Sequence, residues 1–225
     1  MNTDLDKAPY GRIFLMRHGD SRKDTVKRYI GQSDAPLNGR GREQAEWWRT
    51  KLAPLRFSRV FCSDLVRSMQ TARIIMAGNE ELPSAHAALR EISMGDWEGL
   101  AMADVRADQP EKYSERGVNP DIHRPPGGES FTDLQDRVVP VFRDILSREE
   151  GNVLVIGHAG VNRVILCHLL GMPLKNLFLL GQDYGCLNLF DRGKSSVRVD
   201  AVNIRPFDGF LSAPYLEKAI NGRYG

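Results

Sequence analysis

Residues 12 to 19 read Arg-Ile-Phe-Leu-Met-Arg-His-Gly, and this stretch decides the class of fold. The run from Ile13 to Met16 is apolar and predicts the first strand of a sheet. Arg17 and His18 follow it directly, so a histidine, and not a serine or a cysteine, stands in the first loop after that strand. Such loops hold the ligands of open α/β sheets. Chance alone produces this tripeptide in some chains, so its meaning depends on partners further along.

Short β-like runs alternate with helical stretches along the chain, which indicates βαβ units and an α/β protein. The predicted strands cover residues 12–16, 59–62, 152–156, 185–190 and 197–202. The predicted helices cover residues 39–52, 64–76, 130–146 and 160–170.

The chain has 225 residues, of which 41% are hydrophobic, so it can bury a full core as one domain. We expect a core over residues 12–202. The polar segment 103–128 ends in two prolines and two glycines and is expected to be an excursion from that core. The tail 203–225 is too apolar to be a free tail.

The composition argues against several classes of protein. A formal net charge of +2 gives no overall field for nucleic acid or acidic lipid, so we expect neither as a partner. No stretch approaches the ~20 apolar residues of a membrane span, and the first residues do not resemble a secretory signal, so we expect a cytoplasmic protein. Cys62, Cys167 and Cys186 are widely spaced among apolar neighbours and are expected to be free thiols. No residue spacing suits a metal.

Three strand-to-helix junctions carry the polar residues that could form a site. They are the segment after Met16, the segment Ser63–Arg67 and the segment Gly157–Gly160. If the three strands are parallel, the junctions open on one edge of the sheet. Ser63 is expected to cap the second helix, and Arg67 then places a cation near the positive end of that helix, which suggests a nearby anion.

The three junctions together contain two arginines and two histidines, close to the N-termini of predicted helices. This combination predicts a phosphate-binding pocket formed by Arg17, His18, Arg67 and His158. Arginine suits it because its planar fork grips two oxygens and keeps its proton. The other three histidines lack such a setting, and we expect them to be structural or exposed; they are His86, His123 and His168.

Further motifs extend this pattern in a fixed order along residues 12 to about 202. They are Arg17-His18-Gly19, Gly31 to Leu37, Ser63 to Ala72, Leu89 to Gly99, Pro126 to Ser130 and Gly157 to Gly160. With these motifs the sequence resembles the histidine phosphatases, whose branches include the cofactor-dependent phosphoglycerate mutases. The motifs around Glu91 and Glu129 look like the phosphatase branch.

The resemblance implies a three-layer α/β/α sandwich with a mostly parallel central sheet, as in the phosphoglycerate mutases, built as a single domain over residues 1–225. It also implies that His18 is a nucleophile that becomes phosphorylated and that Glu91 is the proton donor. The residues that it places on the phosphoryl oxygens are Arg17, Arg67 and His158. An imidazole can attack phosphorus without a metal if cations neutralise the equatorial oxygens, so we expect no cofactor.

The sequence departs from the family pattern just after His18. Many members have Glu, Thr and Asn where this chain has Asp20, Ser21 and Asp24. Ser21 keeps the hydroxyl and stays among the predicted phosphate-binding residues. Asp24 would repel a phosphate dianion unless a cation pairs with it, so we leave it out. Glu98, the competing carboxylate, belongs to a Trp-Glu-Gly turn and is expected to be structural.

The best interpretation is a metal-independent phosphomonoesterase that acts on a small phosphorylated metabolite. The segment Tyr29-Ile30-Gly31, followed by Asp34-x-Pro36-Leu37, is similar to the corresponding segment of α-ribazole phosphatases. This similarity makes α-ribazole 5'-phosphate a candidate substrate. A phosphoglycerate mutase is the main alternative, and a non-catalytic phosphate-binding protein is a distant one. The segment after Val153 lacks the glycine spacing of a dinucleotide site. The sequence leaves open whether the chain forms a homodimer.

Overall fold

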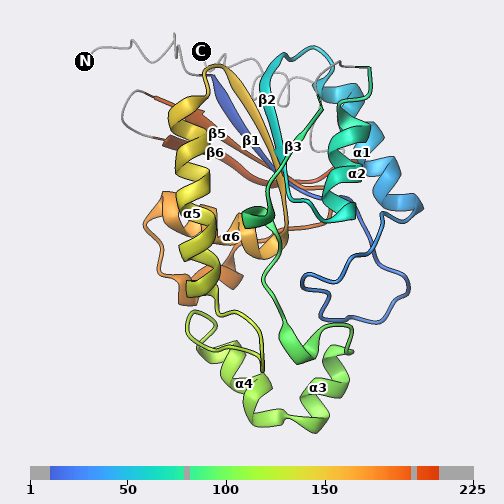
Figure 1. Ribbon diagram of the computed structural model, residues 1–225, viewed down its shortest axis with the longest axis vertical. Helices are drawn as coiled ribbons and strands as arrows, with labels where there is room; N and C mark the ends of the chain where they lie inside the picture. Colours follow the sequence, from blue (N-terminus) through green and yellow to red (C-terminus); the bar gives the residue numbers. More distant parts are fainter. Residues whose placement is uncertain (1–10, 79–81, 194–196, 208–225) are drawn as a thin grey trace.

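A six-stranded mixed sheet forms the centre of the molecule (Figure 1). The computed structural model describes residues 11–78, 82–193 and 197–207. The strand order is β3-β2-β4-β1-β5-β6, and three of the five pairings between neighbouring strands are parallel. The strands are β1 (Arg12–Arg17), β2 (Phe57–Cys62), β3 (Ser84–Ala85), β4 (Asn152–Gly157), β5 (Leu187–Arg192) and β6 (Val197–Ile204).

Two helices cover each face of the sheet, as the sandwich prediction requires. In Figure 1, α1 (Gly39–Leu52) and α2 (Val66–Ile75) lie on one side, while α5 (Phe131–Arg148) and α6 (Ala159–Leu170) lie on the other. The expected three-layer α/β/α fold is thus confirmed.

The alternation of side chains along β1 explains why both faces need a cover. Ile13 and Leu15 join the core beneath α5 and α6, whereas Phe14 and Met16 join the core beneath α1 and α2. All four side chains are fully buried. Successive residues of a strand point to opposite faces, so an unbroken apolar run fits a strand that is buried on both sides.

A pair of short helices lies beyond the edge of the sheet to which the parallel strands point (Figure 1). These are α3 (Met102–Asp108) and α4 (Pro110–Val118), and all of their residues but Met102 fall within the segment 103–128, where the sequence predicts no helix. Helices of 7 and 9 residues are too short to show a clear hydrophobic period. Three short 3₁₀ segments are likewise absent from the prediction; they are η2 (Ala87–Leu89), η3 (Gly95–Trp97) and η4 (Leu174–Leu179).

The expected cap of α2 is wrong. The helix begins at Val66, with Leu65 and not Ser63 as the N-cap residue. The Ser63 hydroxyl instead accepts a hydrogen bond from the Leu65 amide at 3.2 Å, and Asp34 Oδ1, from a distant loop, accepts from the Val66 amide at 2.8 Å. A tertiary contact therefore supplies the cap, and no local motif could reveal it.

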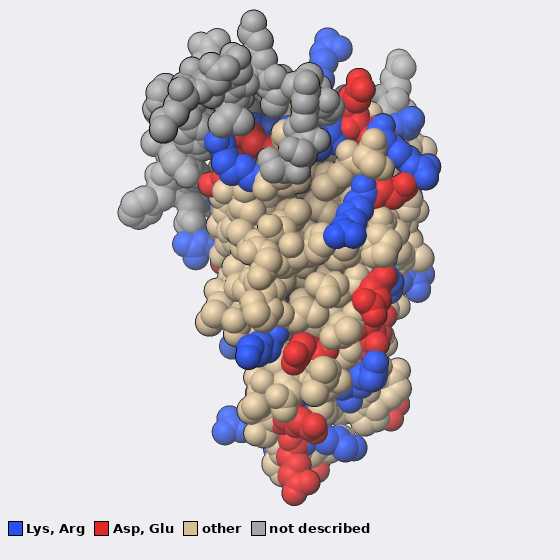
Figure 2. All heavy atoms as spheres, turned by 90° about the vertical axis from the view of Figure 1, so that its left-hand side faces the viewer, with Lys and Arg blue, Asp and Glu red and all other residues tan. Residues whose placement is uncertain are grey.

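The three cysteines are buried free thiols, as predicted. No helix among the described residues is long and apolar enough to cross a bilayer. On the face in Figure 2, acidic and basic side chains are interspersed among the described residues and do not gather into one basic patch. Residues 208–225, most of the tail that we expected to be packed, lie outside the described part of the chain.

Candidate active site

The three predicted junctions meet at one edge of the sheet. Strands β1, β2 and β4 are parallel neighbours, so their carboxyl ends point the same way. A cavity of about 470 Å³ lies there. Its walls include five of the six predicted site residues, which are Arg17, His18, Ser21, Arg67 and Glu91.

His18 is held as a neutral imidazole with a defined tautomer. Its Nδ1 lies 2.7 Å from the backbone oxygen of Gly19. A carbonyl oxygen can only accept, so Nδ1 carries the proton and donates it. The lone pair is then on Nε2, which accepts a hydrogen bond from Arg67 Nε at 3.2 Å. The side chain thus presents a nucleophilic nitrogen directly beside a fixed cation.

Burial keeps the two site imidazoles uncharged. The pKa of His18 lies well below its usual value of 6.5, first because of burial and then because of Arg67 and Arg17. The pKa of His158 is lowered in the same way by burial and by Arg67. A neutral imidazole is the form that can attack phosphorus.

The side chain of Arg67 is fixed by hydrogen bonds, although the positive end of a helix dipole is an unfavourable place for a cation. Only 2% of it is exposed. Its Nη1 donates to the Ser33 carbonyl and its Nη2 to the Gly31 carbonyl, both at 2.7 Å. With Nε facing His18, the planar fork cannot rotate away. This preorganisation is what a charge-stabilising group needs.

Arg17 is fixed by residues that no sequence motif singles out. Its Nη1 donates to the Gln182 carbonyl at 2.5 Å, and its guanidinium carbon lies 3.7 Å from the centre of the Tyr184 ring. Tyr184 also lies beside His18, with ring centres 5.6 Å apart. Both residues come from the stretch before β5, which carries no signal of a site in the sequence.

His158 lies beside His18 but does not line the cavity. The two ring centres are 5.0 Å apart, and His158 is fully buried. Neither of its ring nitrogens has a hydrogen-bond partner among the described residues. A buried polar atom without a partner is costly, so this arrangement fits a site that is completed by a ligand.

Glu91 reaches the N-terminus of α6. Both of its carboxylate oxygens lie 3.1 Å from the Gly160 amide, which donates to them. A Cβ atom on residue 160 would lie 2.4 Å from Glu91 Oε1, so the glycine makes this approach possible. A carboxyl group is thereby placed at the cavity that Arg17 and Arg67 also line.

The remaining predictions from the sequence can be placed as well. Ser21 is buried and lines the cavity. Asp24 does not line the cavity and forms an ion pair with Arg28 at 3.6 Å, which agrees with leaving Asp24 out of the predicted phosphate-binding residues. Glu98 accepts hydrogen bonds from Ser33 Oγ and from the amides of Gln32 and Met94, as a structural residue would.

The position of the His18 pKa can be measured. In NMR titration of the free protein, we expect the His18 imidazole to stay neutral until the pH falls well below 6.5. Replacing Arg67 with methionine should raise the midpoint, because Arg67 is one of the charges that lower it. A wild-type midpoint at or above 6.5 would contradict the lowering of the His18 pKa by burial and by the two arginines.

No group of three or more His, Cys, Asp or Glu side chains in the described ranges is arranged to hold a metal ion. The cavity is lined by several arginines, the His18 imidazole and the Glu91 carboxyl group, and the arginines suit an anion.

Comparison with known proteins matches the chain to one family over almost its whole length. The family described as histidine phosphatase superfamily (branch 1) matches residues 13–205. The adenosylcobalamin/alpha-ribazole phosphatase of Escherichia coli (strain K12) is 29% identical over 195 residues, which are 86% of this chain and 96% of that protein. The glucosyl-3-phosphoglycerate phosphatase of Mycolicibacterium vanbaalenii is 31% identical over 180 residues, which are 76% of this chain and 79% of that protein.

Solved structures agree with the sequence matches. The alpha-ribazole phosphatase from Shigella flexneri has a TM-score of 0.79 and 30% identity, and the match covers 88% of this chain and 98% of that one.

Proposed function

Because this chain belongs to the histidine phosphatase superfamily (branch 1), we propose that it hydrolyses small phosphate monoesters through a phosphohistidine at His18. The observation that carries the proposal is the hydrogen bond from Arg67 Nε to His18 Nε2 at 3.2 Å, while Nδ1–H of His18 donates to the Gly19 carbonyl. The proposal is supported by Arg17, Ser21, Arg67 and Glu91, which line the same cavity as His18, and by His158, which lies beside His18.

In the first step, the Nε2 lone pair of His18 attacks phosphorus and forms a P–N bond. The ester P–O bond breaks, and its electron pair goes to the leaving oxygen, which takes the proton of the Glu91 carboxyl group. Charge on the equatorial oxygens is stabilised by Arg17 and Arg67, which line the cavity, with the Ser21 hydroxyl as a further donor. His158 lies beside His18 outside the cavity lining, and a ring nitrogen of His158, unpartnered among the described residues, would complete this set once the ester is bound.

In the second step, the Glu91 carboxylate takes a proton from water as the water oxygen attacks phosphorus. The P–N bond breaks and its electron pair returns to Nε2. The net reaction converts a phosphate monoester and water into an alcohol and inorganic phosphate, and both residues regain their starting states.

The cavity lining also contains apolar and aromatic side chains, which form what we call its apolar wall. They include Tyr29, Met94, Met102, Tyr113, Phe131 and Phe178. Covering roughly 100 Å² of an apolar ring contributes about 2.5 kcal/mol, or roughly 70-fold in affinity. We therefore propose an ester whose alcohol part carries an apolar ring, and α-ribazole 5'-phosphate is such a compound.

One observation favours a second candidate. Arg116 of α4 lines the cavity, is only 7% exposed, and has an Nη1 without a hydrogen-bond partner among the described residues. Its guanidinium carbon lies 5.2 Å from the centre of the Phe131 ring. A second anionic group on the substrate, such as the carboxylate of a phosphoglycerate, would pair with this atom.

Phosphate release from a panel of esters in excess chelator separates the two candidates. We expect kcat/KM for α-ribazole 5'-phosphate to exceed that for 3-phosphoglycerate by about tenfold to hundredfold, because only the former covers the apolar wall. The reverse order, abolished by Arg116→Met, would support the second candidate.

The same assay, primed with a trace of 2,3-bisphosphoglycerate, tests the mutase alternative. Isomerisation of 3-phosphoglycerate much faster than phosphate release would contradict a hydrolase. Activity restored after chelation only by a divalent ion would contradict the metal-independent mechanism.

A further inference from the structure

The carboxyl group of Glu91 depends on a support outside the cavity. We propose that Arg137 of α5, paired with Glu129, is a positioning residue that aims Glu91 at the leaving oxygen. This inference rests on the proposed role of Glu91 as the proton donor, and its test separates the two claims.

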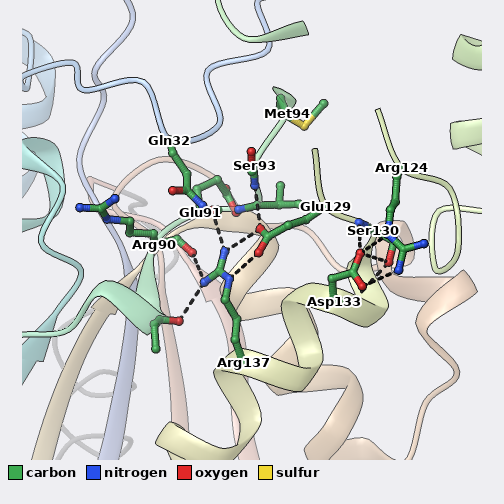
Figure 3. A network of polar contacts seen from close by, with 12 residues as sticks. Gln32, Arg90, Glu91, Ser93, Met94, Arg124, Glu129, Ser130, Asp133 and Arg137 are labelled. Atoms are coloured by element: carbon green, nitrogen blue, oxygen red, sulfur yellow. Dashed lines mark hydrogen bonds and ion pairs between the residues drawn. The ribbon is translucent and has the colours of Figure 1, made fainter. Parts of the chain in front are cut away.

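The guanidinium of Arg137 binds the backbone that carries Glu91 (Figure 3). Its Nη1 donates to the carbonyl oxygens of Ala88 at 2.9 Å and Arg90 at 2.8 Å, and its Nη2 donates to the carbonyl oxygen of Glu91 at 2.9 Å. One side chain thus gathers three carbonyls within four residues. Arg90 and Glu91 follow η2 and belong to no helix or strand, so their carbonyl groups depend on such side-chain donors.

Glu129 completes the support on the other side of Glu91. Its carboxylate accepts from Arg137 Nε at 2.7 Å and from Arg137 Nη2 at 2.8 Å. Its Oε2 also accepts from the Ser93 amide at 2.8 Å. Burial alone would raise the pKa of Glu129, but hydrogen bonds from Arg137 and Ser93 lower it, so the carboxylate stays charged. The pair therefore holds the chain both at and beyond Glu91.

This arrangement leaves little freedom to Glu91 itself. Its carbonyl oxygen accepts from Gln32 Nε2 at 3.1 Å as well as from Arg137, while its carboxylate accepts from the Gly160 amide. Arg137 does not line the cavity and so cannot act on the substrate directly. Its hydrogen bonds reach the site through the backbone of Glu91, and its charge also helps to lower the pKa of the buried His158.

A displaced proton donor has a distinctive kinetic effect. A general acid must lie within hydrogen-bond reach of the leaving oxygen, and an error of about 1 Å can cost ~10²-fold in rate. The loss falls on poor leaving groups, which need the proton. A good leaving group, such as 4-nitrophenolate, departs without it.

The test compares kcat/KM for an alkyl phosphate and for 4-nitrophenyl phosphate, since kcat/KM reports the steps up to phosphoryl transfer. We expect Arg137→Met to lower the first value by about tenfold to hundredfold, while the second changes little. Glu129→Gln should show the same imbalance more weakly. Arg137→Lys should recover part of the loss, because it keeps the charge but not the fork.

Arg124→Met is the matched control. Arg124 forms a similar two-bond ion pair with Asp133, in the first turn of α5, with both bonds at 2.6 Å, but it reaches away from residues 88–93 (Figure 3). We expect both substrates to keep their wild-type values in this variant. Thermal unfolding verifies that each variant is folded. If Arg137→Met does not fold, the kcat/KM values of Glu129→Gln and Arg137→Lys for the two substrates test the proposal.

Glu91→Gln supplies the reference for the interpretation. If it shows no dependence on the leaving group, the proposed role of Glu91 fails. If Glu91→Gln shows the dependence, but the folded Arg137 and Glu129 variants lower both substrates equally or not at all, the positioning role is overturned and the pair is merely structural.

Discussion

Replacing His18 with alanine is expected to lower turnover of every phosphate ester by at least about 10⁴-fold, because the variant lacks the atom that accepts the phosphoryl group. The arginines that bind phosphate remain, so the variant should still bind a substrate with a similar Kd. Stopped assays of phosphate release and isothermal titration measure the two quantities.

His168→Ala is the control for this variant. His168 lies in the last turn of α6, at the opposite end of that helix from His158, and accepts a hydrogen bond from Arg143. Its removal should leave turnover within a fewfold of wild type. Substantial activity in His18→Ala would move the nucleophile to another residue.

Arg67→Ala is expected to lower kcat by about 10²–10³-fold, because it removes a fixed charge donor beside the attacked phosphorus. The neighbouring Nε2 then faces a void in place of a cation. Arg67→Met fills more of that space without restoring the charge, so it should be as slow as the alanine variant but more stable. Steady-state kinetics and thermal unfolding measure both effects.

Arg73→Ala removes an exposed arginine from the last turn of the same helix and should leave kcat unchanged. If Arg67→Met were folded and retained wild-type kcat, Arg67 would serve only to tie the loop at Gly31 and Ser33, and the role in charge stabilisation would be wrong.

The sequence predicts the parts of this site that depend on hydrophobic periodicity and on the residues at the strand-to-helix junctions. The apolar run of β1 sets the sheet, and the polar residues after each parallel strand must then share an edge. His18, Arg67 and His158 can therefore be grouped from the order of residues along the chain. Helix α1 has the bounds that the sequence predicts, because Ala45, Trp48 and Leu52 recur at helical spacing.

Other parts depend on contacts between distant segments and leave no local trace. Tyr184 stacks on Arg17 although the two lie far apart in the sequence, and Asp34 caps a helix that starts at Val66. Arg137 lies within the helix predicted over residues 130–146, but nothing in the sequence shows that its guanidinium binds the Glu91 backbone.

The central claim is that the phosphoryl group passes through Nε2 of His18. Rapid quench of the enzyme with ³²P-labelled substrate, followed by alkaline digestion and NMR of the phosphohistidine, tests it most directly. We expect an acid-labile, base-stable label on Nε2 of His18 that is absent from His18→Ala. A label on Nδ1, on His158 or on a hydroxyl or carboxyl group would contradict the account.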